Sequence, residues 1–97
     1  MVKMHIGVLT LHLHFDGCTS LKEKRSRLKP LLTRLHREFN ISVAEVDYQD
    51  VWQDSVIACC LVSNNQGHTQ RTLQQISDWI ETSWPDVTLI EDQLDML

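Results

Sequence analysis

Residues 54–63 read Asp-Ser-Val-Ile-Ala-Cys-Cys-Leu-Val-Ser, and every side chain from Val56 to Val62 is apolar. Side chains alternate between the two faces of a β-strand, so this stretch is apolar on both faces. A strand of that kind lies in the middle of a sheet or is covered on both sides. One of two sets then points away from any covering helices: Ile57, Cys59 and Leu61, or Val56, Ala58, Cys60 and Val62.

The segments around this strand complete an order of strands and helices. Residues 3–14, 41–46 and 87–94 are predicted strands, and residues 20–40 and 69–83 have the apolar spacing of helices. The order is βαββαβ, which at this length predicts an α+β ferredoxin-like sandwich. Two helices cover one face of a four-stranded antiparallel sheet of order 4-1-3-2. Residues 1–97 form a single domain.

The first helix has start and stop signals of its own. Ser20 and Glu23 have the spacing of a capping box, and Asn40 ends the helix. Pro30 removes one backbone hydrogen bond, so we expect a kink there and no break, because the apolar stripe continues in phase. The stripe consists of Leu21, Leu28, Leu32, Leu35 and Phe39.

Composition excludes several classes of protein. The chain is 42% apolar and 23% charged, which are ordinary globular values. It has no apolar run long enough for a membrane span and no secretory signal pattern, so we expect neither. Three cysteines, an odd number, without such a signal indicate the reducing cytoplasm.

The net charge of −4 hides an asymmetry. Residues 20–38 contain seven of the nine Lys and Arg residues and two carboxylates, a net charge of +5. The rest of the chain has two cations and eleven carboxylates, a net charge of −9. The basic helix is either a solvated helix face or a surface for an anionic partner, most simply a phosphate backbone. Its candidate binding residues are Ser20, Lys22, Lys24, Arg25, Arg27 and Lys29.

The topology brings three connections to one end of the domain. They are residues 16–25, the hairpin of residues 48–53 and the dipeptide Trp84-Pro85. The hairpin adds the candidate residues Gln49, Asp50, Trp52 and Gln53. We favour Trp52 as an anchor folded over the first helix, the alternative being an exposed contact residue. Asp50 either caps the turn or acts as a carboxylate at the loop end.

The open face of the sheet lacks the internal aromatic side chains that stack bases in RNA-recognition motifs. An apolar open face instead predicts a homodimer through that face. His12 and His14 project on one face about 7 Å apart, but no metal-ligand signature accompanies them. No nucleophile–base pair or phosphate loop is present either. We therefore expect no metal, no cofactor and no small-molecule substrate.

Four strings of residues suggest a family. They are Ser20-Leu-Lys-Glu-Lys-Arg25, Val43-Ala-Glu-Val46, Gln49-Asp-Val-Trp-Gln53 and Val62-Ser-Asn64. In this order and spacing, over nearly the whole chain, they resemble the YlxP-like family of uncharacterised bacterial proteins. The resemblance implies a ferredoxin-like fold, a small cytoplasmic protein, and genes often adjacent to translation and ribosome-maturation factors. Tyr48, where many members have His, and Pro30 depart from the pattern.

The leading expectation is a small cytosolic, non-enzymatic binding protein that contacts RNA or the ribosome through its basic first helix. The first alternative is a homodimeric protein-interaction module. The second is a small enzyme that uses Asp50 at the loop end.

Overall fold

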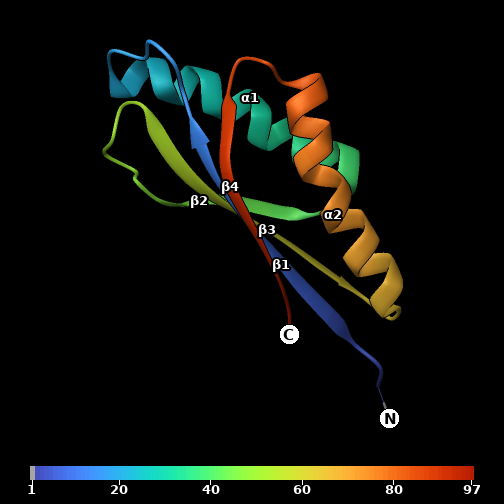
Figure 1. Ribbon diagram of the computed structural model, residues 1–97. Helices are drawn as coiled ribbons and strands as arrows, with labels where there is room; N and C mark the ends of the chain where they lie inside the picture. The colour runs from blue at the N-terminus through green and yellow to red at the C-terminus, as the bar shows by residue number, and fades with distance from the viewer. Residues whose placement is uncertain (1) are drawn as a thin grey trace.

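Six elements follow one another in the predicted order in the computed structural model, which describes residues 2–97. They are β1 (His5–His14), α1 (Leu21–Phe39), β2 (Ser42–Asp47), β3 (Asp54–Ser63), α2 (Gln66–Ser83) and β4 (Thr88–Met96). The strands form one antiparallel sheet of order β2-β3-β1-β4, and both helices lie on the same face of it (Figure 1). The ferredoxin-like prediction is therefore confirmed, because 4-1-3-2 is the same order counted from the opposite edge.

The two central strands divide their side chains between the helix face and the open face. Leu9, Leu11 and Leu13 of β1 are buried beneath the helices, together with Ile57 and Cys59 of β3. The alternate residues of β3 point to the open face, which settles the question that the sequence left undecided. These are Val56, Ala58, Cys60 and Val62.

Helix α1 begins and ends where the sequence predicts. The Ser20 hydroxyl accepts a hydrogen bond from the Glu23 backbone N–H at 3.0 Å. The Glu23 carboxylate in return accepts from the Thr19 N–H at 2.8 Å, one residue before the usual partner in a capping box. The helix continues without a break through Pro30 and ends at Asn40, which has a left-handed backbone with φ of 52°.

The apolar stripe of α1 differs from the prediction at four apolar positions. Leu31 is buried beside Leu28 and Leu35 although it was not predicted to be, whereas Leu21, Leu32 and Phe39 are only partly buried. The fourth buried residue is Lys24, which occupies the turn before Leu28. Burial of a lysine in this stripe changes the interpretation of the basic helix.

Helix α2 starts three residues earlier than predicted. The Asn65 side chain accepts a hydrogen bond from the His68 N–H at 3.0 Å, so the first turn forms at Gln66, ahead of Thr69. Trp84 ends the helix as predicted, and its N–H donates to the Ile80 carbonyl at 2.9 Å. Within residues 2–97, no helix has the length and apolarity to cross a membrane.

Candidate nucleic-acid interface

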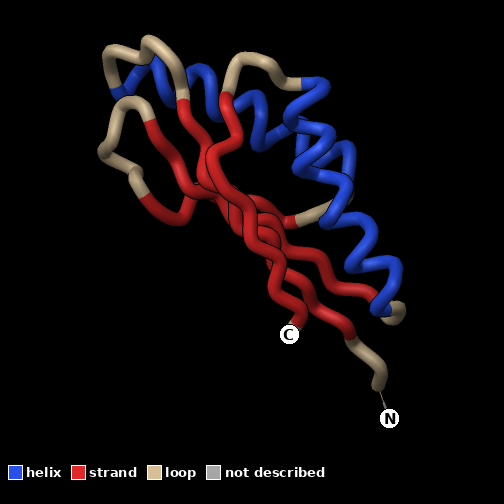
Figure 2. The backbone as a smooth tube through the Cα atoms, in the orientation of Figure 1, coloured by secondary structure: helices blue, strands red, loops and turns tan. Residues whose placement is uncertain are grey.

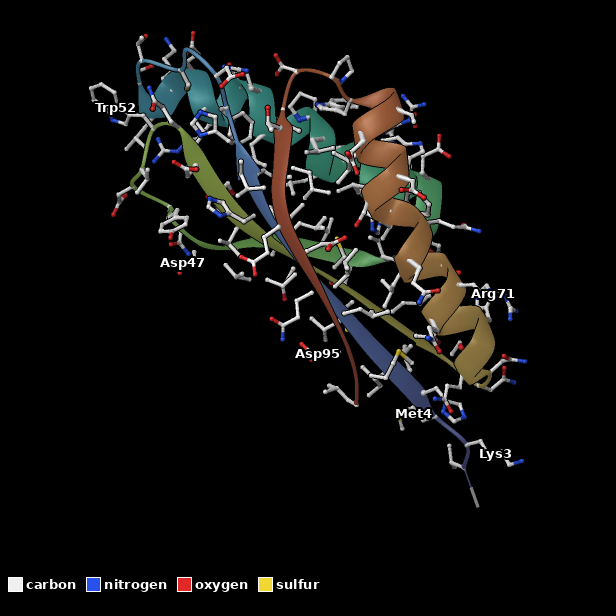
Figure 3. The ribbon with its side chains drawn as sticks, in the orientation of Figure 1. Lys3, Met4, Asp47, Trp52, Arg71 and Asp95 are labelled. Atoms are coloured by element: carbon white, nitrogen blue, oxygen red, sulfur yellow. The ribbon has the colours of Figure 1, made fainter. Side chains whose placement is uncertain are left out.

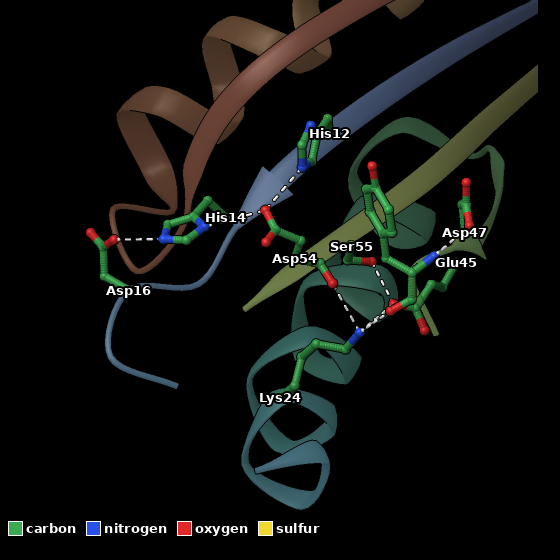
Figure 4. Close-up of polar contacts among 9 residues, drawn as sticks. His12, His14, Asp16, Lys24, Glu45, Asp47, Asp54 and Ser55 are labelled. Carbon is green, nitrogen blue, oxygen red and sulfur yellow. Dashed lines mark hydrogen bonds and ion pairs between the residues drawn. The ribbon is translucent and has the colours of Figure 1, made fainter. Parts of the chain in front are cut away.

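Lys24 ties the first turn of α1 to the β2–β3 hairpin. Its side chain is 0% exposed, and Nζ donates to the Tyr48 carbonyl at 2.7 Å and to the Asp54 carbonyl at 3.0 Å (Figure 4). Nζ also lies 3.0 Å from Oε2 of Glu45, a carboxylate that is largely buried. The amine is therefore fully engaged inside the protein. Its burial argues against Lys24 as one of the candidate binding residues of the basic helix.

The partners of Lys24 are themselves held in place. Ser55 Oγ donates to Glu45 Oε2 at 2.6 Å, which fixes the carboxylate against β3. Tyr48 has a positive φ of 60°, a conformation that is uncommon outside glycine. Its N–H donates to the Asp47 side chain at 2.7 Å while its carbonyl accepts from Lys24. The hairpin conformation thus depends on hydrogen bonds made by both backbone groups of Tyr48, its N–H and its carbonyl.

Three connections meet at one end of the domain, as the topology predicts (Figure 2). The Phe15 N–H donates to the Gln53 carbonyl at 2.8 Å, and Gln53 Nε2 donates to the Cys18 carbonyl at 3.4 Å. Gln49 adds a longer contact, 3.5 Å from its carbonyl oxygen to Lys24 Nζ. These bonds join the loop that follows β1 to the β2–β3 hairpin.

Arg27 links the same loop to the connection before β4. Its guanidinium donates to both carboxylate oxygens of Asp86, at 3.0 and 3.1 Å, and to the Asp16 carbonyl at 3.0 Å. It also lies 5.4 Å from the centre of the Phe15 ring. The hydrogen bonds that Arg27 donates to Asp86 raise the pKa of its guanidinium, although partial burial opposes them. Arg27 therefore has a structural role in joining two loops.

The remaining cations of α1 form the accessible basic surface. Among residues 2–97, Lys22, Arg25, Lys29 and Arg37 are exposed and make no ion pair, whereas Arg34 pairs with Glu38 at 3.2 Å. A groove of about 470 Å³ runs along this face. Its walls include Arg25, Lys29, Pro30, Arg34, Arg37 and Trp84. We call this groove, with Lys22 at its N-terminal end, the basic groove.

Trp52 is not the anchor that we favoured from the sequence. It is 52% exposed and points away from the domain at the tip of the hairpin (Figure 3). The side chain that joins the hairpin to α1 is instead Lys24, through the carbonyls of Tyr48 and Asp54. Asp50 is also exposed in this hairpin. Among the candidate binding residues, Ser20 has a structural role, because its side chain caps the N-terminus of α1.

A polar cluster at the exit of β1 was not predicted as a unit. His12 Nε2 and His14 Nδ1 donate to the same oxygen of Asp54, at 2.9 and 3.2 Å, and His14 Nε2 lies 3.1 Å from Asp16 (Figure 4). The antiparallel register pairs His12 with Val56 and His14 with Asp54, so Asp54 lies beside both rings. Within the described residues, no three His, Cys, Asp or Glu side chains are arranged to hold a metal ion.

Asp54 makes the free energy of unfolding depend on pH in the acidic range. Burial raises the pKa of its carboxyl, but the hydrogen bonds from His12 and His14 outweigh burial, and the net pKa lies below the usual 3.8. A lowered pKa in the folded state stabilises the protein above the unfolded-state pKa, and this stabilisation is lost as the pH falls through the folded-state pKa.

We expect Asp54→Asn to lower the free energy of unfolding by about 1 kcal/mol at pH 7, because charged hydrogen bonds are replaced by neutral ones. The difference between the variant and the parent protein should shrink below about pH 4. Urea denaturation from pH 3 to pH 7 measures both effects. Asp50→Asn is the matched control and should be neutral throughout. An Asp54→Asn deficit that persists undiminished at pH 3 contradicts the assignment.

The fold and the converging loops first define a class, small α+β proteins with a ferredoxin-like fold. The de novo designed protein Foldit4 matches this architecture over 98% of the present chain and 97% of its own, with a TM-score of 0.56 and 12% identity. That similarity concerns the fold alone.

Sequence similarity then gives the family. Residues 6–93 match the model of a family described as protein of unknown function (DUF503), and the chain belongs to that family. It is 41% identical over 68 residues to the uncharacterized protein YlxP of Bacillus subtilis (strain 168), covering 70% of this chain and 73% of that protein. The resemblance to a YlxP-like family is thereby confirmed.

Proposed function

We propose that this protein is a non-enzymatic RNA-binding domain that contacts RNA through the basic groove of α1. The observation that carries the proposal is that one groove is lined both by cations without an ion-pair partner and by a tryptophan. The cations are Arg25, Lys29 and Arg37, and the tryptophan is Trp84. Free cysteines at positions 18, 59 and 60 support a place in the reducing cytosol.

The spacing of the groove residues fits a chain of phosphates. Arg25, Lys29, Thr33 and Arg37 follow one another at intervals of four residues and line a single cavity. At about 1.5 Å rise per residue, successive side chains are about 6 Å apart along the helix axis. Three cations and one hydroxyl thus present a row of hydrogen-bond donors to a flexible anionic strand.

The partly exposed Trp84 ring favours RNA over an acidic protein as the partner that we propose. It lines the basic groove beside Pro30 and is stacked against Trp79, with ring centroids 6.0 Å apart. Proteins that bind single-stranded nucleic acid commonly stack unpaired bases on aromatic side chains that lie beside a positively charged groove. We therefore propose single-stranded RNA, including unpaired segments of ribosomal RNA, as the ligand.

The test compares two charge reversals that change the net charge equally. Arg25→Glu with Lys29→Glu alters the basic groove, whereas Lys3→Glu with Arg71→Glu reverses the two cations outside α1. Fluorescence anisotropy with a labelled 20-nucleotide single-stranded RNA should show a Kd at least tenfold weaker for the groove variant at 0.1 M salt. The control should stay within about twofold of the parent protein.

Salt dependence gives a second measurement on the same samples. Four cation–phosphate contacts, one from each unpaired cation of the basic groove including Lys22, predict a slope of about 3 in log Kd against log salt concentration. Loss of two of these contacts predicts about half of that slope. Co-sedimentation with ribosomes should follow the same ranking of the three proteins. Equal affinities and slopes for the groove variant and the control would show that the groove is only a solvated helix face.

A further inference from the structure

The open face of the sheet carries an apolar strip along its two central strands. The register places Val8 of β1 beside Cys60 of β3, and His12 beside Val56. Val62 at one end of the strip is 57% exposed. The strip consists of Ile6 and Val8 on β1 and of Val56, Ala58, Cys60 and Val62 on β3.

Carboxylates flank this strip on both edge strands. Asp47 of β2 pairs in register with Val56, while Glu91 and Asp95 of β4 pair with His12 and Val8, respectively. Figure 3 labels Asp47 and Asp95. None of the four strands contains a lysine or an arginine, because the nine cations lie at position 3, in α1 and at position 71. The open face is therefore apolar along its centre, negative along β4, and negative at the hairpin end of β2, and we call these two charged places the acidic margins.

A hollow between β1, β4 and the hairpin lies within this face. It encloses about 200 Å³ and is lined in part by Thr10, His12, Tyr48, Glu91 and Gln93. An aromatic ring and a carboxylate in one small hollow suit the cationic end of a lysine or arginine side chain. The hollow thus provides a specific place for one basic residue of a partner.

We propose that the open face binds a basic amphipathic helix of another protein, with its apolar stripe on the central strip and its Lys and Arg residues against the acidic margins. Charge complementarity and the strip between two acidic edges support this occupant. The helix would cover this face as α1 and α2 cover the opposite one. This surface and the basic groove lie on opposite sides of the sheet, so one protein can bind RNA and a basic helix at the same time.

A second copy of this chain fits the open face less well, which bears on the homodimer expected from the sequence. Two such faces would meet without a single strand lysine or arginine to pair with Asp47, Glu91 or Asp95 of either copy. Helix α1 of a second copy is not a substitute, because its apolar stripe is buried in its own core.

Cys60 provides a direct probe of this surface. It is the partly exposed cysteine on the open face, whereas Cys18 and Cys59 are buried. Burial also raises the pKa of Cys18, and it raises the pKa of Cys59 to about 12, so both are poor nucleophiles near neutral pH. The rate of alkylation by iodoacetamide at pH 8 therefore reports whether the open face is covered.

The experiment uses two synthetic 18-residue amphipathic helices, one of leucine and lysine and one of leucine and glutamate. The lysine peptide should slow alkylation of Cys60 at least fivefold, and the glutamate peptide should leave the rate unchanged. Glu91→Lys with Asp95→Lys should abolish the protection. Asp78→Lys with Glu81→Lys, an equal reversal at exposed positions of α2, should preserve it.

Three results would overturn the proposal. The first is the absence of protection by the lysine peptide. The second is equal protection by both peptides, or equal loss in both charge-reversed variants, since either would remove the role of the acidic margins. The third is an alkylation rate that falls as the concentration of the protein itself rises, with a dimeric mass by light scattering, because a second copy then covers the face.

Discussion

Replacing Lys24 by methionine is expected to lower the free energy of unfolding by about 3 kcal/mol, the largest effect expected for any charged residue of α1. Methionine preserves most of the side-chain volume but removes the amine that contacts Glu45 and the carbonyls of Tyr48 and Asp54. The Glu45 carboxylate, with a side chain only 18% exposed, then loses its counter-ion. Breaking one side of a buried ion pair is costly because the other charge stays buried.

Urea denaturation at pH 7 measures this loss, and Lys29→Met is the matched control. Lys29 is exposed on the same helix and makes no ion pair among residues 2–97, so its replacement should change stability by less than about 0.5 kcal/mol. Hydrogen exchange should also show earlier opening of hairpin residues 48–53 in Lys24→Met than in the control. A Lys24→Met variant as stable as Lys29→Met would contradict the structural role of this amine.

Gly7→Ala is expected to cost about 2 kcal/mol, because α2 packs directly against the backbone of β1 at this position. A Cβ atom at Gly7 would lie 2.6 Å from Cδ1 of Leu73 and 3.0 Å from Cγ2 of Thr69. Both of these side chains are fully buried, so neither can move aside without displacing the helix. Overpacking of this kind destabilises proteins by about 1–3 kcal/mol.

Gly67→Ala is the control for that substitution. A Cβ there would meet Nη1 of Arg71 at 2.8 Å, but this is the far end of an exposed, flexible side chain. Gly67 lies in the first turn of α2, where alanine is the better helix former, so the change should be neutral or stabilising by up to about 1 kcal/mol. Thermal unfolding of the two variants side by side separates the effects, and equal melting temperatures would contradict the close approach at Gly7.

The fold could be predicted from the sequence because its signals are local and agree with one another. The run from Val56 to Val62 specifies a central strand, and the residues around Ser20 specify a helix start. The sequence left open which side chains of β3 point to the open face, and the structure was needed to decide this. The late start predicted for α2 arose from treating Asn65 as a loop residue, although asparagine is a good N-cap that allows helix to begin at the next residue.

The site was harder to predict because the number of charged residues in a helix does not say which of their side chains point to solvent and which point to the core. Lys24 follows Leu21 by three residues and precedes Leu28 by four, so it lies on the apolar stripe of the helix. This spacing was the available signal for its burial. The pairing of Arg27 with Asp86 has no comparable signal, because 59 residues separate the two and only the tertiary fold brings them together.

The contact between Lys24 and Glu45 also limits how this chain can change over evolutionary time. Exchanging both for well-packed apolar residues is often neutral or favourable in proteins, whereas losing either one alone leaves an unbalanced charge inside. A lineage that carries this pair must therefore pass through a poorly folded intermediate to lose it. Lys24 and Glu45 are therefore expected to persist or disappear together, independently of substitutions at the exposed positions of α1.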